Sequence, residues 1–126
     1  MVDEPIAFHR ALASRDEGAR TLDEKPVTRF DRIELNRILA IYGRMVAAGE
    51  WRDYTIDFLE DVAAFSIFRR SSEMALFQVV KRPRLKSKQG QYAVVAAGGQ
   101  VLRRGHELAQ VLKIFDKKLL KALAAE

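Results

Sequence analysis

The stretch that most constrains the fold of this chain is Gln91–Phe115, with the sequence QYAVVAAGGQVLRRGHELAQVLKIF. The β-branched and small residues of Tyr92–Ala96 favour a strand, and Gly98-Gly99 is a two-residue turn signal before Val101-Leu102 restarts the strand. Arg103-Arg104-Gly105 then leads into a helical pattern. Because a hairpin and one helix close a core only when further strands extend the sheet, this stretch predicts an antiparallel sheet with a covering helix.

Three segments upstream supply the further strands. Trp51–Leu59 alternates between apolar and polar residues, and Val62–Arg69 follows it after a Glu60-Asp61 turn. Met74–Lys81 is apolar on both faces apart from Gln78, a pattern typical of a central strand or one covered on both sides. Since two helices on one face leave the second face half-covered, we expect a second copy of the chain or the N-terminal tail to lie there.

The first helix is predicted to begin at Asp31. Asp31 and Glu34 form a D-x-x-E variant of the capping box, and Gly49 offers a left-handed end to the helix. The apolar face is predicted to contain Leu35, Ile38, Leu39, Tyr42, Met45 and Val46, and the opposite polar side to contain Arg32, Asn36, Arg37 and Arg44. A second helix is predicted over His106–Leu123.

Together these elements predict an α+β fold. The expected order is one helix, about five antiparallel strands and a C-terminal helix that closes the sheet, in a two-layer sandwich. Residues 1–28 lack periodicity and mix charges of both signs, so we expect a poorly ordered N-terminal tail followed by a single domain over 29–126.

Composition excludes several classes of function. The chain of 126 residues has no cysteine, which excludes disulfides, thiolate metal sites and cysteine nucleophiles. No window approaches the roughly 18 apolar residues that span a bilayer, and the N-terminus lacks a signal-peptide pattern, so we expect a cytoplasmic protein without a membrane partner. No cofactor fingerprint is present: Gly98-Gly99 lies outside any G-x-G-x-x-G sequence, and we expect no cofactor and no metal.

Positive charge is concentrated in one segment. Met74–His106 contains no acidic residue, although the formal charge of the whole chain is only +5. A block of one sign attracts nucleic acid, acidic proteins or anionic ligands, but it also serves simply to keep a loop soluble. The candidate residues for binding nucleic acid or another anion are Lys81, Arg82, Arg84, Lys86, Lys88, Arg103, Arg104 and His106.

No group of residues predicts catalysis. Asp53 and Asp57 lie about 13 Å apart along a strand, too far to share a proton or one metal ion. Ser71 and Ser72 have no histidine partner in view. We therefore favour a function that is not enzymatic, and leave an enzymatic role open beside ligand binding.

Three phrases, IYGRMVAAGEWRDY (41–54), FSIFRR (65–70) and YAVVAAGGQVLRRGHELAQVL (92–112), resemble an uncharacterised alphaproteobacterial domain-of-unknown-function family. The resemblance covers roughly residues 29–116. It implies a bacterial, cytoplasmic, stand-alone small domain, and it carries no activity, cofactor or site residue.

Three functions stay open. The first is a non-enzymatic protein-interaction or regulatory module that binds another protein or forms a weak homodimer, because one strand is apolar on both faces and opposite charges lie on separate surfaces. The alternative is a nucleic-acid-binding module that uses the basic 81–104 region. The third is binding of a small anionic ligand near the helix start at 103–106.

Overall fold

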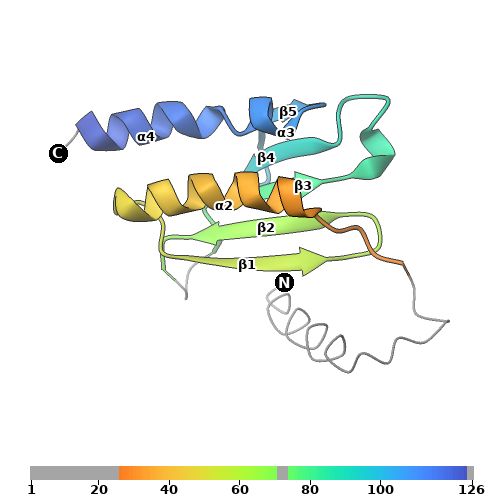
Figure 1. The fold of residues 1–126 in the computed structure, drawn as a ribbon, viewed down its shortest axis with the longest axis horizontal. Coiled ribbons are helices and arrows are strands. Elements are labelled where there is room, and N and C mark those ends of the chain that lie inside the picture. The colour runs from red at the N-terminus through yellow and green to blue at the C-terminus, as the bar shows by residue number, and fades with distance from the viewer. Residues whose placement is uncertain (1–25, 71–73, 125–126) are drawn as a thin grey trace, which may run out of the picture.

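Five antiparallel strands, paired in the order of the sequence, form an open sheet with helices on one face (Figure 1). The structure is a computed structural model that describes residues 26–70 and 74–124. It confirms the predicted α+β class, although the tail predicted over 1–28 falls almost wholly outside the described residues. The strands are β1 (Asp53–Phe58), β2 (Ala63–Phe68), β3 (Phe77–Lys81), β4 (Tyr92–Ala96) and β5 (Val101–Gly105).

The central strand is β3, as its two-sided apolarity predicts. It pairs with β2 through Phe65↔Val79 and with β4 through Val79↔Val94. Val79 is fully buried on the helix side of the sheet, and Val80 is 5% exposed on the other side, in a small cluster with Ala64 and Ala93. Self-association through that second face stays a prediction.

Helix α2 (Arg32–Ala47) begins with the predicted capping box. The Asp31 carboxylate accepts from the Glu34 N–H, and the Glu34 carboxylate accepts from the Asp31 N–H, each at 2.8 Å. Gly49 follows the helix with φ +79°, a conformation that L side chains rarely adopt.

The buried face of α2 differs from the predicted one by part of a turn. Ile41 is buried and Val46 is 41% exposed, where the periodicity predicts Val46 on the apolar face. Glu34 is the physical reason, because its buried contacts turn a polar residue inward together with Ile38, Ile41 and Met45.

The second predicted helix is two helices, α3 (Leu108–Val111) and α4 (Ile114–Ala124). It begins at Leu108 rather than His106 because the chain stays in β5 as far as Gly105. A short 3₁₀ turn, η1 (Pro83–Leu85), interrupts the basic connection between β3 and β4.

Aromatic side chains fill the space between the sheet and the helices. Trp51 is 3% exposed and meets Phe115 edge to face at 5.0 Å, while Tyr54 stacks on Phe65 at 4.7 Å. Such pairs add to the burial of large apolar area. The contacts of Tyr42 with Trp51, Tyr54 and Phe65 join the end of α2 to this cluster, in which Trp51 is a core residue and Tyr54 is 39% exposed.

Candidate functional site: a cationic groove between the helices

The basic loop between β3 and β4 lies against the end of β5. A Cβ atom added to Gly90 would come within 2.3 Å of the Gly105 carbonyl carbon, so the two backbones touch. The Arg104 guanidinium donates to the Gly90 carbonyl at 3.4 Å. The loop and the strand end, which are separate in sequence, therefore share one end of the sheet.

Arg103 and Arg104 nevertheless point to opposite faces of the sheet. Arg103 pairs with Val94, which belongs to the core under the helices, and Arg104 pairs with Ala93, which belongs to the cluster on the other face. Since directly paired residues of antiparallel strands share a face, the two arginine side chains leave the sheet on opposite faces.

Some of the other predicted anion-binding residues form hydrogen bonds or ion pairs within the protein, and the rest have exposed side chains. Lys81 is engaged: its ammonium donates to Glu34 and to the Arg29 carbonyl, each at 2.8 Å. Arg84 lies 3.9 Å from Asp61, both well exposed. The side chains that remain exposed are Arg82, Lys86, Lys88, Arg103 and His106. Anion binding by this set stays a prediction.

Lys81 belongs to a buried polar network at the start of α2. One Glu34 oxygen accepts from Lys81 and from the Asp31 N–H, and the other accepts a short hydrogen bond from the Tyr92 hydroxyl. Burial, together with the hydrogen bond to Glu34, raises the pKa of Tyr92 well above its usual value. Because every buried polar atom here has a partner, the network joins α2 to β3 and β4 and leaves no group for a ligand.

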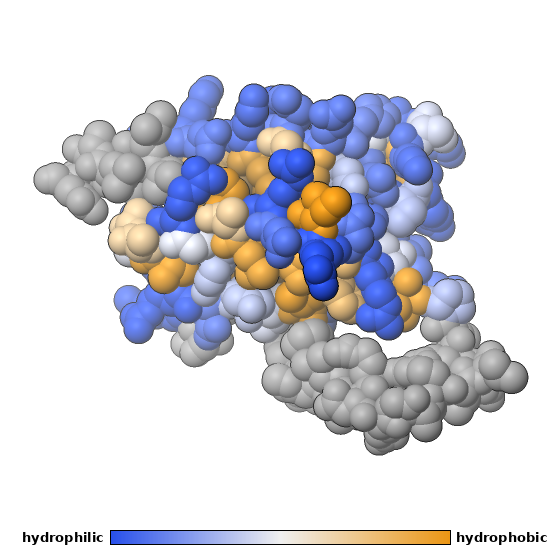
Figure 2. All heavy atoms as spheres, viewed as in Figure 1, coloured by the Kyte–Doolittle hydropathy of each residue, from blue (hydrophilic) through white to orange (hydrophobic). Residues whose placement is uncertain are grey.

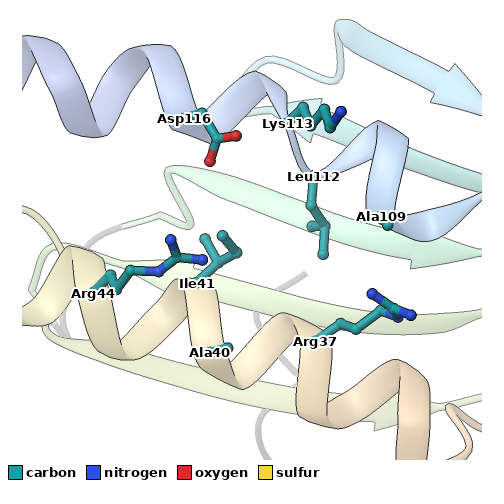
Figure 3. Close-up of a pocket in the computed structure, with 8 residues that line it drawn as sticks. All are labelled: Arg37, Ala40, Ile41, Arg44, Ala109, Leu112, Lys113 and Asp116. Atoms are coloured by element: carbon teal, nitrogen blue, oxygen red, sulfur yellow. The ribbon is translucent and has the colours of Figure 1, made fainter.

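A groove runs between α2 and the α3–α4 segment (Figure 3). Its α2 wall consists of Arg37, Ala40, Ile41 and Arg44, which occupy positions i, i+3, i+4 and i+7 on one face of the helix. The short Ala40 leaves the hollow open, and buried Ile41 forms part of the floor.

The opposite wall repeats the same spacing. Ala109 lies in α3, Leu112 and Lys113 lie in the turn that follows it, and Asp116 lies in α4, at i, i+3, i+4 and i+7 in the sequence. Leu112 is 4% exposed and points toward α2 (Figure 3). On this side of the molecule, Figure 2 shows apolar side chains in the middle of a hydrophilic surface.

The charges around the groove are unpaired. Among the described residues, Arg37, Arg44, Lys113 and Asp116 make no ion pair and no side-chain hydrogen bond. All four are exposed, and three of them are cations. The groove thus has a net positive rim above an apolar floor.

The size of the groove favours side chains over an enclosed small molecule. Its volume is about 250 Å³, below the roughly 300–1,000 Å³ of sites that enclose drug-sized ligands. Its lining contains no histidine, serine, threonine or tyrosine. Within residues 26–70 and 74–124, no three His, Asp or Glu side chains are grouped to hold a metal ion.

Sequence reasoning missed this groove. Arg37 and Arg44 fall on the polar side of the predicted helix, where charges are usually only solvated. The available signal was Ala40 between the like charges of Arg37 and Arg44 on one helical face, but nothing in the sequence says that this stripe meets Ala109–Asp116.

Comparisons with known proteins give a family but no function. No helix in the described part of the chain has the length and apolarity needed to cross a membrane. Neither the curated proteins nor the solved structures contain a match to this chain. The model of one family matches residues 28–112, which include α2, all five strands, α3 and six of the eight groove residues. The chain therefore belongs to DUF2794, a family of proteins of unknown function.

Proposed function

We propose that this protein is a non-enzymatic interaction module that binds an acidic protein partner in the groove between α2 and α3–α4. The observation that carries the proposal is the unpaired cationic rim of Arg37, Arg44 and Lys113 around the floor of Ile41 and Leu112. Elsewhere in the described structure the cation Lys81 is already bound to Glu34. Unpaired cations attract the acidic groups of a partner, and the apolar surface beside them can bury the partner's apolar side chains. Electrostatic complementarity of this kind favours acidic partners.

A second candidate is nucleic-acid binding by the basic loop. The specific observation in its favour is the backbone contact of Gly90 with Gly105, which holds Arg82, Lys86 and Lys88 beside the end of β5. Two observations argue against it. Arg103 and Arg104 lie on opposite faces of the sheet. Tyr92, the aromatic nearest these basic residues in the sequence, is buried, so in the described part of the chain no exposed aromatic side chain accompanies them for stacking on nucleic-acid bases.

Paired charge reversals separate the two functions. We expect R37E/R44E to weaken binding of a fluorescent peptide rich in Glu and Leu by about tenfold or more, since each lost contact becomes a repulsion. K86E/K88E removes the same number of cations from the loop and is the matched control. Fluorescence anisotropy at low salt measures the peptide, and a DNA duplex of about 20 base pairs tests the alternative.

The outcomes are distinct. Loss of peptide binding in R37E/R44E alone supports the groove. Equal loss in both variants indicates unspecific attraction to net charge and contradicts the proposal, as does an absence of peptide binding to the unmodified protein. Duplex binding that K86E/K88E removes would assign the loop to nucleic acid.

A further inference from the structure

We infer that the partner segment is an amphipathic α-helix with the pattern acid-x-x-apolar-apolar-x-x-acid. This inference rests on the proposed function and adds the form and the spacing of the partner. Its apolar pair is expected to contact Ile41 and Leu112, and its two acidic residues to contact Arg37 and Arg44.

The shape of the groove carries the first step. The α2 wall is a helical stripe with i, i+3, i+4 and i+7 spacing, whereas the facing wall passes from α3 through the turn at Leu112 and Lys113 into α4. Helices α2 and α4 run side by side in Figure 1. A helix laid along such a groove presents its own residues at the same intervals. An extended peptide advances about 3.3 Å per residue and would match the walls at few positions.

The charges carry the second step. Arg37 and Arg44 are seven residues apart, which is about 10 Å along the helix axis. Acidic residues seven apart on a partner helix have the same separation, so each guanidinium can receive one carboxylate while the residues between fill the apolar floor. Figure 3 shows the Arg37 side chain extending toward Ala109 and the Arg44 side chain lying beside Ile41.

Asp116 carries the third step, because its negative charge repels an acidic residue of the partner helix. It projects from α4 toward the Arg44 end of the groove, and Lys113 stands on the same wall, at the turn between α3 and α4 (Figure 3). The two ends of the groove therefore differ, and the carboxylate near Arg44 is expected to limit the affinity for a diacidic helix.

The chain itself does not supply this helix. No segment of its 126 residues has two acidic residues seven apart with apolar residues at both the third and fourth positions between them. An occupant with this pattern is therefore not a segment of these 126 residues, and we take it to be a different protein.

The test uses designed helical peptides of about 18 residues, long enough to be helical in an alanine-rich background. One carries Glu-x-x-Leu-Leu-x-x-Glu. A second has the same composition with a central proline that prevents the helix. We expect the helical peptide to bind about tenfold tighter than the proline peptide, with the difference lost in R37E/R44E.

The variant D116N is expected to strengthen peptide binding, whereas R37E/R44E weakens it. Removing this carboxylate is expected to tighten binding of the helical peptide by about two- to fivefold, the range for one exposed charge contact. A misfolded variant cannot produce a gain. Asp61→Asn, an exposed acid on the β1–β2 turn, is the matched control and is expected to have no effect.

The failures of the two claims differ. If the proline peptide binds as tightly as the helical one and both depend on Arg37 and Arg44, the proposed function stands and the helical partner is wrong. If D116N has no effect or weakens binding, the register against Arg44 is wrong. If neither peptide binds, both the proposed function and this inference are overturned.

Discussion

Replacing Glu34 with alanine is expected to lower the free energy of unfolding by about 3–5 kcal/mol, the usual cost of removing one partner from a buried ion pair. The Glu34 side chain is 10% exposed and that of Lys81 is 15% exposed. The substitution leaves the Lys81 ammonium with only the Arg29 carbonyl and the Tyr92 hydroxyl without its acceptor. It also removes half of the capping box of α2. Urea unfolding followed by circular dichroism measures the change.

An exposed ion pair provides the control for this prediction. Glu50 lies 3.6 Å from Arg69, with side chains that are 36% and 54% exposed. Glu50→Ala is expected to change the free energy of unfolding by less than about 1 kcal/mol, because water screens such pairs. Equal losses in the two variants would show that the Glu34 network is not what joins α2 to the sheet.

Replacing Gly90 with alanine is expected to lower the free energy of unfolding by about 3 kcal/mol. The φ angle of +107° is strained for any L side chain, and the added Cβ would lie 2.3 Å from the Gly105 carbonyl carbon. A left-handed conformation costs roughly 1–2 kcal/mol, and forcing an extra carbon into a packed contact costs roughly 1–3 kcal/mol. The obstacle is backbone rather than a flexible side chain, so either the basic loop or the end of β5 has to move.

Gly43→Ala is the matched control and is expected to change the free energy of unfolding in the opposite direction. Gly43 lies inside α2, and its added Cβ would meet no atom within 4 Å. Alanine there is expected to stabilise the protein by about 0.5–1 kcal/mol, since glycine is a poor helix former. Thermal unfolding of both variants gives the comparison, and a Gly90 variant that unfolds at the same temperature as the unmodified protein would show that the loop is not held against β5.

Local patterns were sufficient to predict the fold. The two-sided apolarity of Met74–Lys81 predicts the central strand, which begins at Phe77 in the structure. The Asp31–Glu34 pair predicts the start of α2, and both patterns depend on residues close in sequence. The helix face was less predictable. Glu34 stands at helical spacing with the buried residues Ile38, Ile41 and Met45, but a carboxylate is not expected on a buried face. Its partners Lys81 and Tyr92 are 47 and 58 residues away in the sequence.

The candidate site depends on placement that the sequence does not contain. The basic residues near β4 are close in the sequence and therefore predict one anion-binding site. In the structure, Lys81 pairs with Glu34, and Arg103 and Arg104 lie on opposite faces of the sheet. The groove unites Arg37 and Arg44 with residues some 70 positions later, and it exists because α3–α4 packs beside α2 on the same face of the sheet.

The most direct test of the groove is chemical-shift mapping on the full 126-residue chain. Titration of ¹⁵N-labelled protein with the helical Glu-x-x-Leu-Leu-x-x-Glu peptide is expected to shift the amide signals of Ala40, Ile41, Ala109 and Leu112, the residues between the charged positions of the two walls. Signals of the basic loop, from Arg82 to Gly90, are expected to stay unchanged. Shifts confined to that loop, or absent from both walls of the groove, would contradict the account.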